Sequence, residues 1–292
     1  METIKNENIK KLIKKVRRRK LINVEWDLRT SLLVELLFAD LIIPASNVSD
    51  EQFTFEFVKF NNEQWDNFQV FTDLDEYNKV YGKNNSVEPI VFNLLHFENN
   101  IYPNLGYMVV NKSFKIEMDL IWDAIGYERS YRFKRENYLH KYTLNECQKL
   151  TERYDNSEIN DYLNQRRHIQ SYYSLLDVIK NSVLFTEVLL TQDVNTPVSA
   201  KDVDPSFNFQ DNYIVLYTNL EDANLKYFTI VDFINLVRFI IEKQLECIKI
   251  DTGIKQIKLP RYQLLKHYWE ILDYFEDFNL NHSFEFIFKN NY

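Results

Sequence analysis

The sequence contains one phrase twice, and this repetition constrains its fold more than any other feature. Residues 70–81 read VFTDLDEYNKVY, and residues 216–227 read LYTNLEDANLKY. In both phrases an aromatic residue precedes a Thr, Leu and acidic residues follow at matching positions, and a Tyr comes last. The chain has 292 residues, which is enough for two domains of roughly 100–200 residues each. We therefore expect two related units in tandem.

The segments around the two phrases follow one predicted order, α-β-β-α-β-β-α. The expected elements of the first unit are a helix at 32–39, strands at 40–45 and 68–72, a helix from Thr72, a helical segment at 91–106 that Pro103 interrupts, paired strands at 107–118 and a helix at 119–125. The stretch at 53–60 is expected to add an extra strand to the first unit. Those of the second unit are a helix at 175–182, strands at 183–190 and 213–218, a helix from Thr218, an amphipathic helix at 231–246, paired strands at 246–259 and a helix at 260–275. Small mixed sheets flanked by helices are typical of the α+β class.

Each phrase also carries the pattern of a helix start. Thr72 with Asp75, and Thr218 with Glu221, stand at the spacing of a capping box, in which side chain and backbone satisfy each other across three residues. Further acids suit the positive end of a helix dipole: Asp73, Glu76 and Asp222. A metal-binding or catalytic role for these carboxylates is the alternative, but no His or third ligand accompanies them. We favour the structural interpretation.

The first unit resembles the N-terminal domain of the SseB family, the bacterial "enhanced serine sensitivity" proteins. The resemblance rests on LLVELLFADLIIPA at 32–45, FQVFTDLDEYNKV at 68–80 and GYMVVN at 106–111. It covers residues 31–118, although the family's Pro is missing after Asn111, and the second unit matches more loosely. The resemblance implies an α+β bacterial cytoplasmic domain without an established catalytic activity, and it supplies no catalytic residue.

The sequence lacks the residue patterns of common enzymes. Its four Gly residues stand singly, whereas phosphate-binding loops, dinucleotide fingerprints and nucleophile elbows need Gly in close succession. The five His residues have no Cys, His or acidic partner at the spacing of zinc ligands. Cys147 and Cys247 are too isolated for a disulfide framework or a zinc signature. We expect a protein that is not an enzyme and that needs no cofactor and no metal.

Location and domain boundaries follow from the same survey. No apolar run of about 18 residues is present, and the first residues carry no apolar signal-peptide core. With only two isolated Cys residues, the cytoplasm is the expected compartment. We divide the chain into a basic N-terminal helix at 1–22, a first unit at 23–126, a helical connector at 127–172 and a second unit with a C-terminal extension at 173–292.

Charge is distributed unevenly along the chain. Residues 1–20 hold nine Lys and Arg against two acids, whereas residues 21–126 hold six Lys and Arg against seventeen acids. The N-terminal helix has an apolar stripe of Ile9, Leu12, Ile13 and Val16. We favour docking of this helix on the acidic first unit. Membrane binding, for which the stripe lacks Trp and Phe, and nucleic-acid contact are the alternatives.

Nucleic-acid binding is also the alternative function for the whole protein. It would use six basic residues: Arg17, Arg18, Arg19, Arg129, Arg132 and Arg135. The last three stand among aromatic residues in YERSYRFKRENYLHKY at 127–142, a pattern that can stack bases and hold phosphates. The same segment can equally connect two acidic domains, and the net charge of −8 opposes binding to a polyanion.

We favour a protein–protein function, in which an adaptor or toxin-immunity type of protein docks a basic partner on the acidic first unit. The partner would be a basic protein such as a toxin or a secretion-system component. The expected contact residues are acids and two aromatic anchors: Asp50, Glu51, Glu63, Trp65, Asp66, Asp73, Asp75, Glu76, Tyr77 and Glu88. Electrostatic steering speeds such an encounter, and aromatic anchors hold it. Net charge also serves solubility, so composition alone does not locate the surface.

Overall fold

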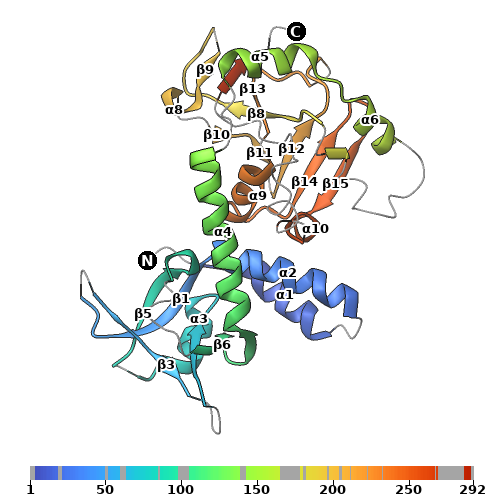
Figure 1. Ribbon diagram of the computed structural model, residues 1–292. Coiled ribbons are helices and arrows are strands. Elements are labelled where there is room, and N and C mark those ends of the chain that lie inside the picture. Colours follow the sequence, from blue (N-terminus) through green and yellow to red (C-terminus); the bar gives the residue numbers. More distant parts are fainter. Residues whose placement is uncertain are drawn as a thin grey trace. The chain divides into compact units, whose positions relative to one another are not determined.

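The structure is a computed structural model that contains two compact units, Met1–Glu136 and Asn137–Tyr292 (Figure 1). It describes the following residues: 4–18, 22–49, 52–59, 64–84, 86–97, 105–138, 143–164, 178–179, 182–195, 197–203, 206–210, 212–221, 223–231, 233–266, 268 and 286–290. Both units combine helices with mixed sheets. The expected α+β class is therefore confirmed.

Two packed helices open the first unit, α1 (Glu7–Arg18) and α2 (Ile22–Phe38). The apolar stripe of α1 is buried along its whole length, with Ile9 1% exposed and Val16 6% exposed. Helix α1 is thus an integral part of the first unit. Docking on this unit, the favoured alternative for the helix, agrees with this burial.

The strands of the first unit form two sheets that meet at one point. The strands are β1 (Asp40–Ser46), β2 (Thr54–Phe55), β3 (Phe57–Val58), β4 (Asp66–Val70), β5 (Glu88–Asn93), β6 (Leu105–Val110) and β7 (Phe114–Glu117). One sheet has the order β2-β1-β5 and the other has the order β3-β4-β6-β7. An antiparallel bridge between Ile42 and Phe71 joins β1 to the end of β4. Aromatic rings join the two sheets, because Phe68 of β4 lies 5.6 Å from Phe55 of β2 and 6.2 Å from Phe92 of β5.

Two helical predictions for the first unit need correction. Residues 88–93 form strand β5, which pairs with β1 from Asp40 to Ala45, and only Leu94–His96 form a short 3-10 helix. The helical segment expected at 91–106 is therefore wrong for residues 91–93, because the apolar run EPIVFN finds a strand partner in β1, and for residues 105–106, which begin strand β6. Pro103 lies outside the described residues. The last helix, α4 (Met118–Tyr138), continues well past the expected end at residue 125, so a boundary at 126 falls inside it.

The second unit begins with α5 (Leu144–Arg153) and α6 (Ser157–Asn164). Thr143 and Glu146 form a complete capping box at the start of α5. Cys147 is buried with Phe185, Phe228 and Phe288 in one apolar cluster. Residues 143–164 of the expected connector thus pack in the core of the second unit.

The remaining elements of the second unit are built around one large sheet. Its strands are β8 (Phe185–Leu189), β9 (Val198–Ser199), β10 (Ser206–Phe207), β11 (Phe209–Gln210), β12 (Tyr213–Tyr217), β13 (Tyr227–Ile230), β14 (Cys247–Asp251), β15 (Gln256–Pro260) and β16 (Phe286–Lys289). The helices are α8 (Ala200–Val203), α9 (Phe233–Glu242) and α10 (Arg261–Leu265). Most of the helix expected at 175–182, and the part of the helix at 260–275 beyond residue 268, lie outside the described residues.

The two units share the order of five paired strands. In the second unit the order runs β15-β14-β12-β8-β13, with β11 on β12 and β10 on β8, and β16 and β9 extend the sheet beyond β13. In the first unit the order β7-β6-β4 continues across the Ile42–Phe71 bridge to β1 and β5, with β3 on β4 and β2 on β1. In both units the central pair is parallel, β4 with β6 and β12 with β14, and a hairpin follows it.

The repeated phrase itself folds in two different ways. In the first unit it forms helix α3 (Leu74–Tyr81). In the second unit the described residues after Thr218 form bends that lead into strand β13 at Tyr227. The helix expected from Thr218 is therefore wrong. The amide of Glu221 is bonded to the Asn219 side chain, and β13 pairs with β8.

Candidate functional site

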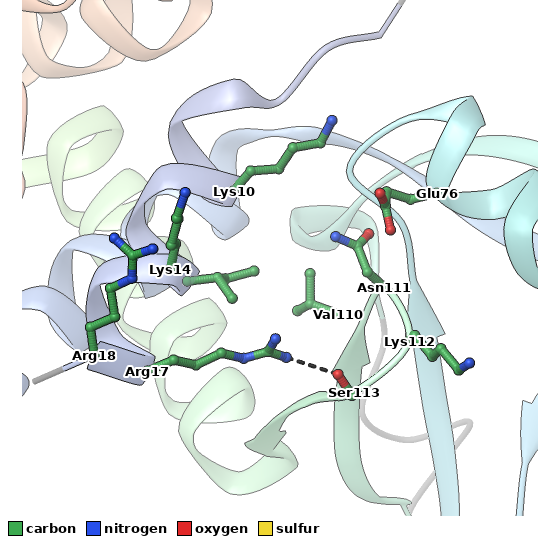
Figure 2. A pocket seen from close by; sticks show the side chains of 10 residues that line it. Lys10, Lys14, Arg17, Arg18, Glu76, Val110, Asn111, Lys112 and Ser113 are labelled. Atoms are coloured by element: carbon green, nitrogen blue, oxygen red, sulfur yellow. Dashed lines mark hydrogen bonds between the residues drawn. The ribbon is translucent and has the colours of Figure 1, made fainter.

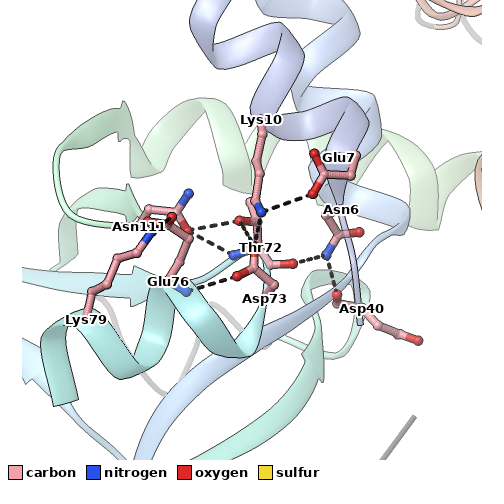
Figure 3. A network of polar contacts seen from close by, with 9 residues as sticks. All are labelled: Asn6, Glu7, Lys10, Asp40, Thr72, Asp73, Glu76, Lys79 and Asn111. Carbon is pink, nitrogen blue, oxygen red and sulfur yellow. Dashed lines mark hydrogen bonds and ion pairs between the residues drawn. The ribbon is translucent and has the colours of Figure 1, made fainter. Parts of the chain in front are cut away.

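Asn6 attaches helix α1 to the first unit (Figure 3). Its side-chain amide donates to the carbonyl of Asp40 at 2.8 Å and to the carbonyl of Thr72 at 3.0 Å. Its backbone carbonyl accepts from the Lys10 backbone amide, which is the first hydrogen bond of the helix. One buried side chain thus joins the start of α1 to the beginning of β1 and to Thr72, which precedes the N-cap residue of α3.

Asp73 connects α1 to α3. Its Oδ1 accepts from the Glu76 amide at 2.9 Å, and its Oδ2 pairs with Lys10 Nζ at 2.6 Å. The N-cap of α3 is therefore Asp73, so the capping box predicted for Thr72 and Asp75 is wrong by one residue. The Thr72 hydroxyl instead donates to Asp73 at 2.9 Å.

The pKa values of this pair move apart. Burial alone would raise the pKa of Asp73, but hydrogen bonds from Lys10, the Glu76 amide and Thr72 outweigh burial and lower it. Burial alone would lower the pKa of Lys10, but its hydrogen bonds to Asp73 and Glu7 raise it. Both groups are therefore charged at neutral pH.

A basic pocket lies beside this network, between α1 and the turn that joins β6 to β7 (Figure 2). Its volume is about 430 Å³. The lining residues are Lys10, Ile13, Lys14, Arg17, Arg18, Glu76, Val110, Asn111, Lys112 and Ser113. Arg17 is held in place, since it donates to Ser113 Oγ at 2.9 Å and lies 5.6 Å from the Phe114 ring centroid.

Asn111 shapes the turn at the pocket wall. Its backbone has φ of 56°, in the left-handed region that Asn tolerates better than most residues. Its side-chain oxygen accepts from the Thr72 amide at 3.0 Å, and its own amide donates to Val70. The turn is thereby tied to the end of β4 and to the network around Asp73.

In the second unit, Asn156 attaches helix α6 in the way that Asn6 attaches α1 in the first. Asn156 donates to the carbonyls of Val183 at 2.7 Å and Thr218 at 2.8 Å, and its carbonyl accepts from the Asn160 amide. Asn160 and Asn164 therefore stand where α1 has Lys10 and Lys14. Asn160 Oδ1 accepts from the Thr218 hydroxyl at 2.7 Å, and Asn164 contacts Thr252 in the β14–β15 turn.

A second pocket of about 370 Å³ lies at the opposite end of β4, around Trp65. It is lined by Trp65, Leu105, Gly106, Tyr107, Glu117 and Asp119. We call it the Trp65 pocket. Trp65 is 49% exposed, and Glu117 and Asp119 are exposed as well.

Gly106 positions the Trp65 side chain. Asp66 pairs with Leu105 and Asn67 pairs with Tyr107, so the ladder passes over Gly106. A Cβ at Gly106 would lie 3.0 Å from the Trp65 Cβ, which is too close for the present position of Trp65. Gly106 is thus a place where another side chain closely approaches the strand.

The predicted acidic surface is dispersed in the structure. Asp73 and Tyr77 are buried, at 5% and 3% exposure, so neither can contact a partner in this conformation. Burial raises the pKa of Tyr77 to about 12, and its hydroxyl donates to Val87. Trp65, Asp66, Asp75 and Glu88 are exposed. Glu76 lines the basic pocket and pairs with Lys79, which lies outside its lining. Asp50, Glu51 and Glu63 lie outside the described residues.

The six basic residues of the alternative function are also separated. Arg17 and Arg18 line the basic pocket. Arg129 donates to the carbonyls of Leu95 at 2.9 Å and Phe97 at 2.8 Å, so it serves the fold of the first unit. Arg19 and the side chains of Arg132 and Arg135 lie outside the described part of the chain.

The sequence prediction missed the partners of Trp65 in its pocket, namely Tyr107, Glu117 and Asp119. The lone Gly106 within an apolar strand pattern is the one local signal of a close approach.

In the described ranges, His, Cys, Asp and Glu side chains do not form groups of three that could hold a metal ion. No helix of the described part has the length and apolar character needed to cross a membrane.

No protein-family model, curated protein or solved structure matches the chain. The resemblance to the SseB family therefore stays a prediction. The function has to be inferred from the geometry of the two pockets.

Proposed function

We propose that the protein is a non-enzymatic interaction module that docks a basic protein partner at the Trp65 pocket. The observation that carries the proposal is a half-exposed Trp at an acid-lined hollow. Gly106 leaves room for the Trp65 side chain above the strand, and Glu117 and Asp119 supply two exposed carboxylates beside it. The proposed surface keeps Trp65 from the sequence prediction, with the exposed Asp66 next to it in sequence, and replaces the buried Asp73 and Tyr77.

The chemistry of the pocket suits a Lys or Arg side chain of the partner. An aromatic face attracts a cation, and carboxylates form charge-assisted hydrogen bonds with it. Tyr107 already has Lys115 Nζ at 5.2 Å from its ring centroid, so the aromatic wall accepts a cation within the protein. Trp is also among the residues that most often dominate interface energetics.

We also infer that the chain is a tandem duplication and that, within the residues that the structure describes, this pocket belongs to the first copy. The shared order of strand pairing and the equivalent roles of Asn6 and Asn156 support duplication. The repeat would then begin with α1 and α6, earlier than the repeated phrase suggests. An adaptor or toxin-immunity protein of this type would use the first copy for recognition.

The proposal is tested by affinity capture from the native host with matched charge variants. Glu117→Gln with Asp119→Asn neutralises the pocket acids, and Asp75→Asn with Glu88→Gln neutralises two exposed acids outside it. We expect a stoichiometric basic partner that the wild type and the second variant retain and the first variant loses. Trp65→Ala should weaken the purified complex by about 2 kcal/mol or more, the scale of an interface hot spot.

Two results would contradict the proposal. One is a partner that binds the pocket variants as tightly as the wild type. The other is the absence of any co-purifying basic protein, together with no binding of Lys- and Arg-rich peptides by the purified chain. Equal weakening by both charge variants would point to general acidity and would also remove the Trp65 pocket as the docking site.

A further inference from the structure

We propose that the basic pocket between α1 and the β6–β7 turn binds a compact anion that carries two or more phosphate groups. The site is separate from the Trp65 pocket, and the two pockets share none of their lining residues. Its volume of about 430 Å³ lies within the range of about 300–1,000 Å³ that is usual for small-molecule sites. Five cationic side chains line it, against one acid, Glu76, which is paired with Lys79.

Three of the five cations are available to a ligand. Lys14, Arg18 and Lys112 form no ion pair or hydrogen bond within the described part of the chain. Lys10 is committed to Asp73 and Glu7. Arg17 is fixed by Ser113 and Phe114, which leaves further guanidinium N–H groups in a set orientation.

The arrangement matches phosphate better than a single carboxylate. Lys14 and Arg18 come from one turn of α1, whereas Lys112 comes from the facing wall (Figure 2). Charges on two walls can neutralise several negative oxygens at once, and Arg forms bidentate bonds to phosphate. The Ser113 hydroxyl and Asn111 add neutral polar groups to the same wall.

A compact anion is favoured over a nucleic-acid strand. Binding to a strand needs a basic groove along the backbone, with aromatic side chains on which bases stack. The lining of this pocket offers Ile13 and Val110 in place of aromatic residues. Arg129, which would have to extend the basic surface, is bonded to two carbonyls elsewhere.

The second unit offers an internal comparison. At the positions of Lys10 and Lys14 it has Asn160 and Asn164, both of which contact Thr hydroxyls. The helix docks in both units, so the Lys residues are not required for docking. The charge of Lys14, which has no ion-pair partner in the described residues, is therefore available for another purpose in the first unit.

Isothermal titration calorimetry of the full chain with inorganic tripolyphosphate, in magnesium-free buffer at about 0.15 M salt, tests the inference. The variant Lys14→Asn, Arg18→Ala, Lys112→Ala removes the three available cations. The matched control Lys11→Ala, Lys15→Ala, Lys83→Ala removes three exposed cations outside the pocket, two of them from the same helix. We expect the first variant to weaken binding at least about tenfold, as loss of charged hydrogen bonds does, and the control less than about twofold.

The remaining arms separate the sources of the phosphates. Tighter binding of ATP than of tripolyphosphate would assign the site to a nucleotide, and equal binding would assign it to the phosphate chain alone. Absence of tripolyphosphate binding to the wild type, or equal loss in both triple variants, would overturn the proposal. The proposal would also be overturned if a single-stranded RNA of about twelve nucleotides bound more tightly than tripolyphosphate and its affinity fell steeply with salt concentration, as it does when many phosphates are contacted. Such a result would identify a nucleic-acid surface.

Discussion

Replacing Asp73 with Ala removes two interactions that link its buried carboxylate to helices, in addition to the bond from the neighbouring Thr72 hydroxyl. The first is the N-cap bond to the Glu76 amide, whose loss costs about 1 kcal/mol. The second is the ion pair with Lys10, in which the Asp73 side chain is 7% exposed and the Lys10 side chain is 32% exposed. Such a pair lies between the surface and buried cases, so we take about 1–2 kcal/mol for it. The free energy of unfolding of the first unit should fall by about 2–3 kcal/mol in total.

Urea denaturation followed by tryptophan fluorescence measures this loss. Trp26, Trp65 and Trp122 belong to the first unit and Trp269 to the second, so the signal reports mainly on the unit that carries Asp73. Asp73→Asn should lose only about half as much, because Asn is an equally good N-cap but carries no charge. A double-mutant cycle with Lys10→Met should give a coupling free energy of about 1–2 kcal/mol.

Asp75→Ala is the matched control for this prediction. Asp75 lies in the first turn of the same helix and is exposed, so its removal should cost about 0.5 kcal/mol or less. If Asp73→Ala were no more costly than Asp75→Ala, or if the coupling with Lys10 were near zero, the ion pair would not help to hold α1. The account of α1 docking would then have to rest on Asn6 and the apolar stripe alone.

Three further predictions concern the same contacts and their counterparts in the second unit. Asn156→Ala should lower the free energy of unfolding of the second unit by about 2–4 kcal/mol, because it leaves buried carbonyls of Val183 and Thr218 without a donor. The control is Asn145→Ala, which removes an exposed side chain. The prediction would be refuted if, in a urea titration, Asn156→Ala lowered this free energy by less than the control does. Thr143→Ala should cost about 1 kcal/mol through loss of the capping box, and Thr143→Ser should restore most of it in the same assay. The lowered pKa of Asp73 means that its carboxylate stabilises the fold above the ordinary carboxyl pKa of about 3.9 and that this contribution is lost as pH falls through the lowered value. The stability difference between wild type and Asp73→Asn should therefore be constant near neutral pH and shrink below about pH 4, and a difference that grows on acidification would contradict the assignment.

Local signals in the sequence predicted some elements well. The capping box at Thr143 and Glu146 forms as expected, and so do the hairpins β6–β7 and β14–β15. The apolar stripe of α1 is buried as its spacing indicated. These features depend on residues a few positions apart, whose geometry the local backbone determines.

The same local signals failed where strand pairing decided the outcome. Thr72 and Thr218 stand in nearly the same phrase, yet only the first leads into a helix. In the second unit, pairing of β13 with β8 begins at Phe228 and leaves little chain for a helix. Tertiary pairing thus overrides a capping pattern.

Burial of the predicted surface residues could not be inferred from the sequence either. Asp73 is covered because Lys10, 63 positions earlier, reaches it from α1. The Trp65 pocket combines the start of β4, strands β6 and β7 and the first turn of α4. An acidic composition shows how many carboxylates are present, but it does not show which of them share a surface.

Helix α1 of the first unit and helix α6 of the second are each held by a neutral Asn side chain, to which the first unit adds the Lys10–Asp73 ion pair. Asn6 and Asn156 use an amide to hold backbone carbonyls that any residue would supply at those positions. The outward side chains of α1 and α6 take no part in this bond, so their charge can change while the helix stays in place. A duplicated unit of this kind can acquire a new binding specificity by altering one helix surface, at little risk to its fold.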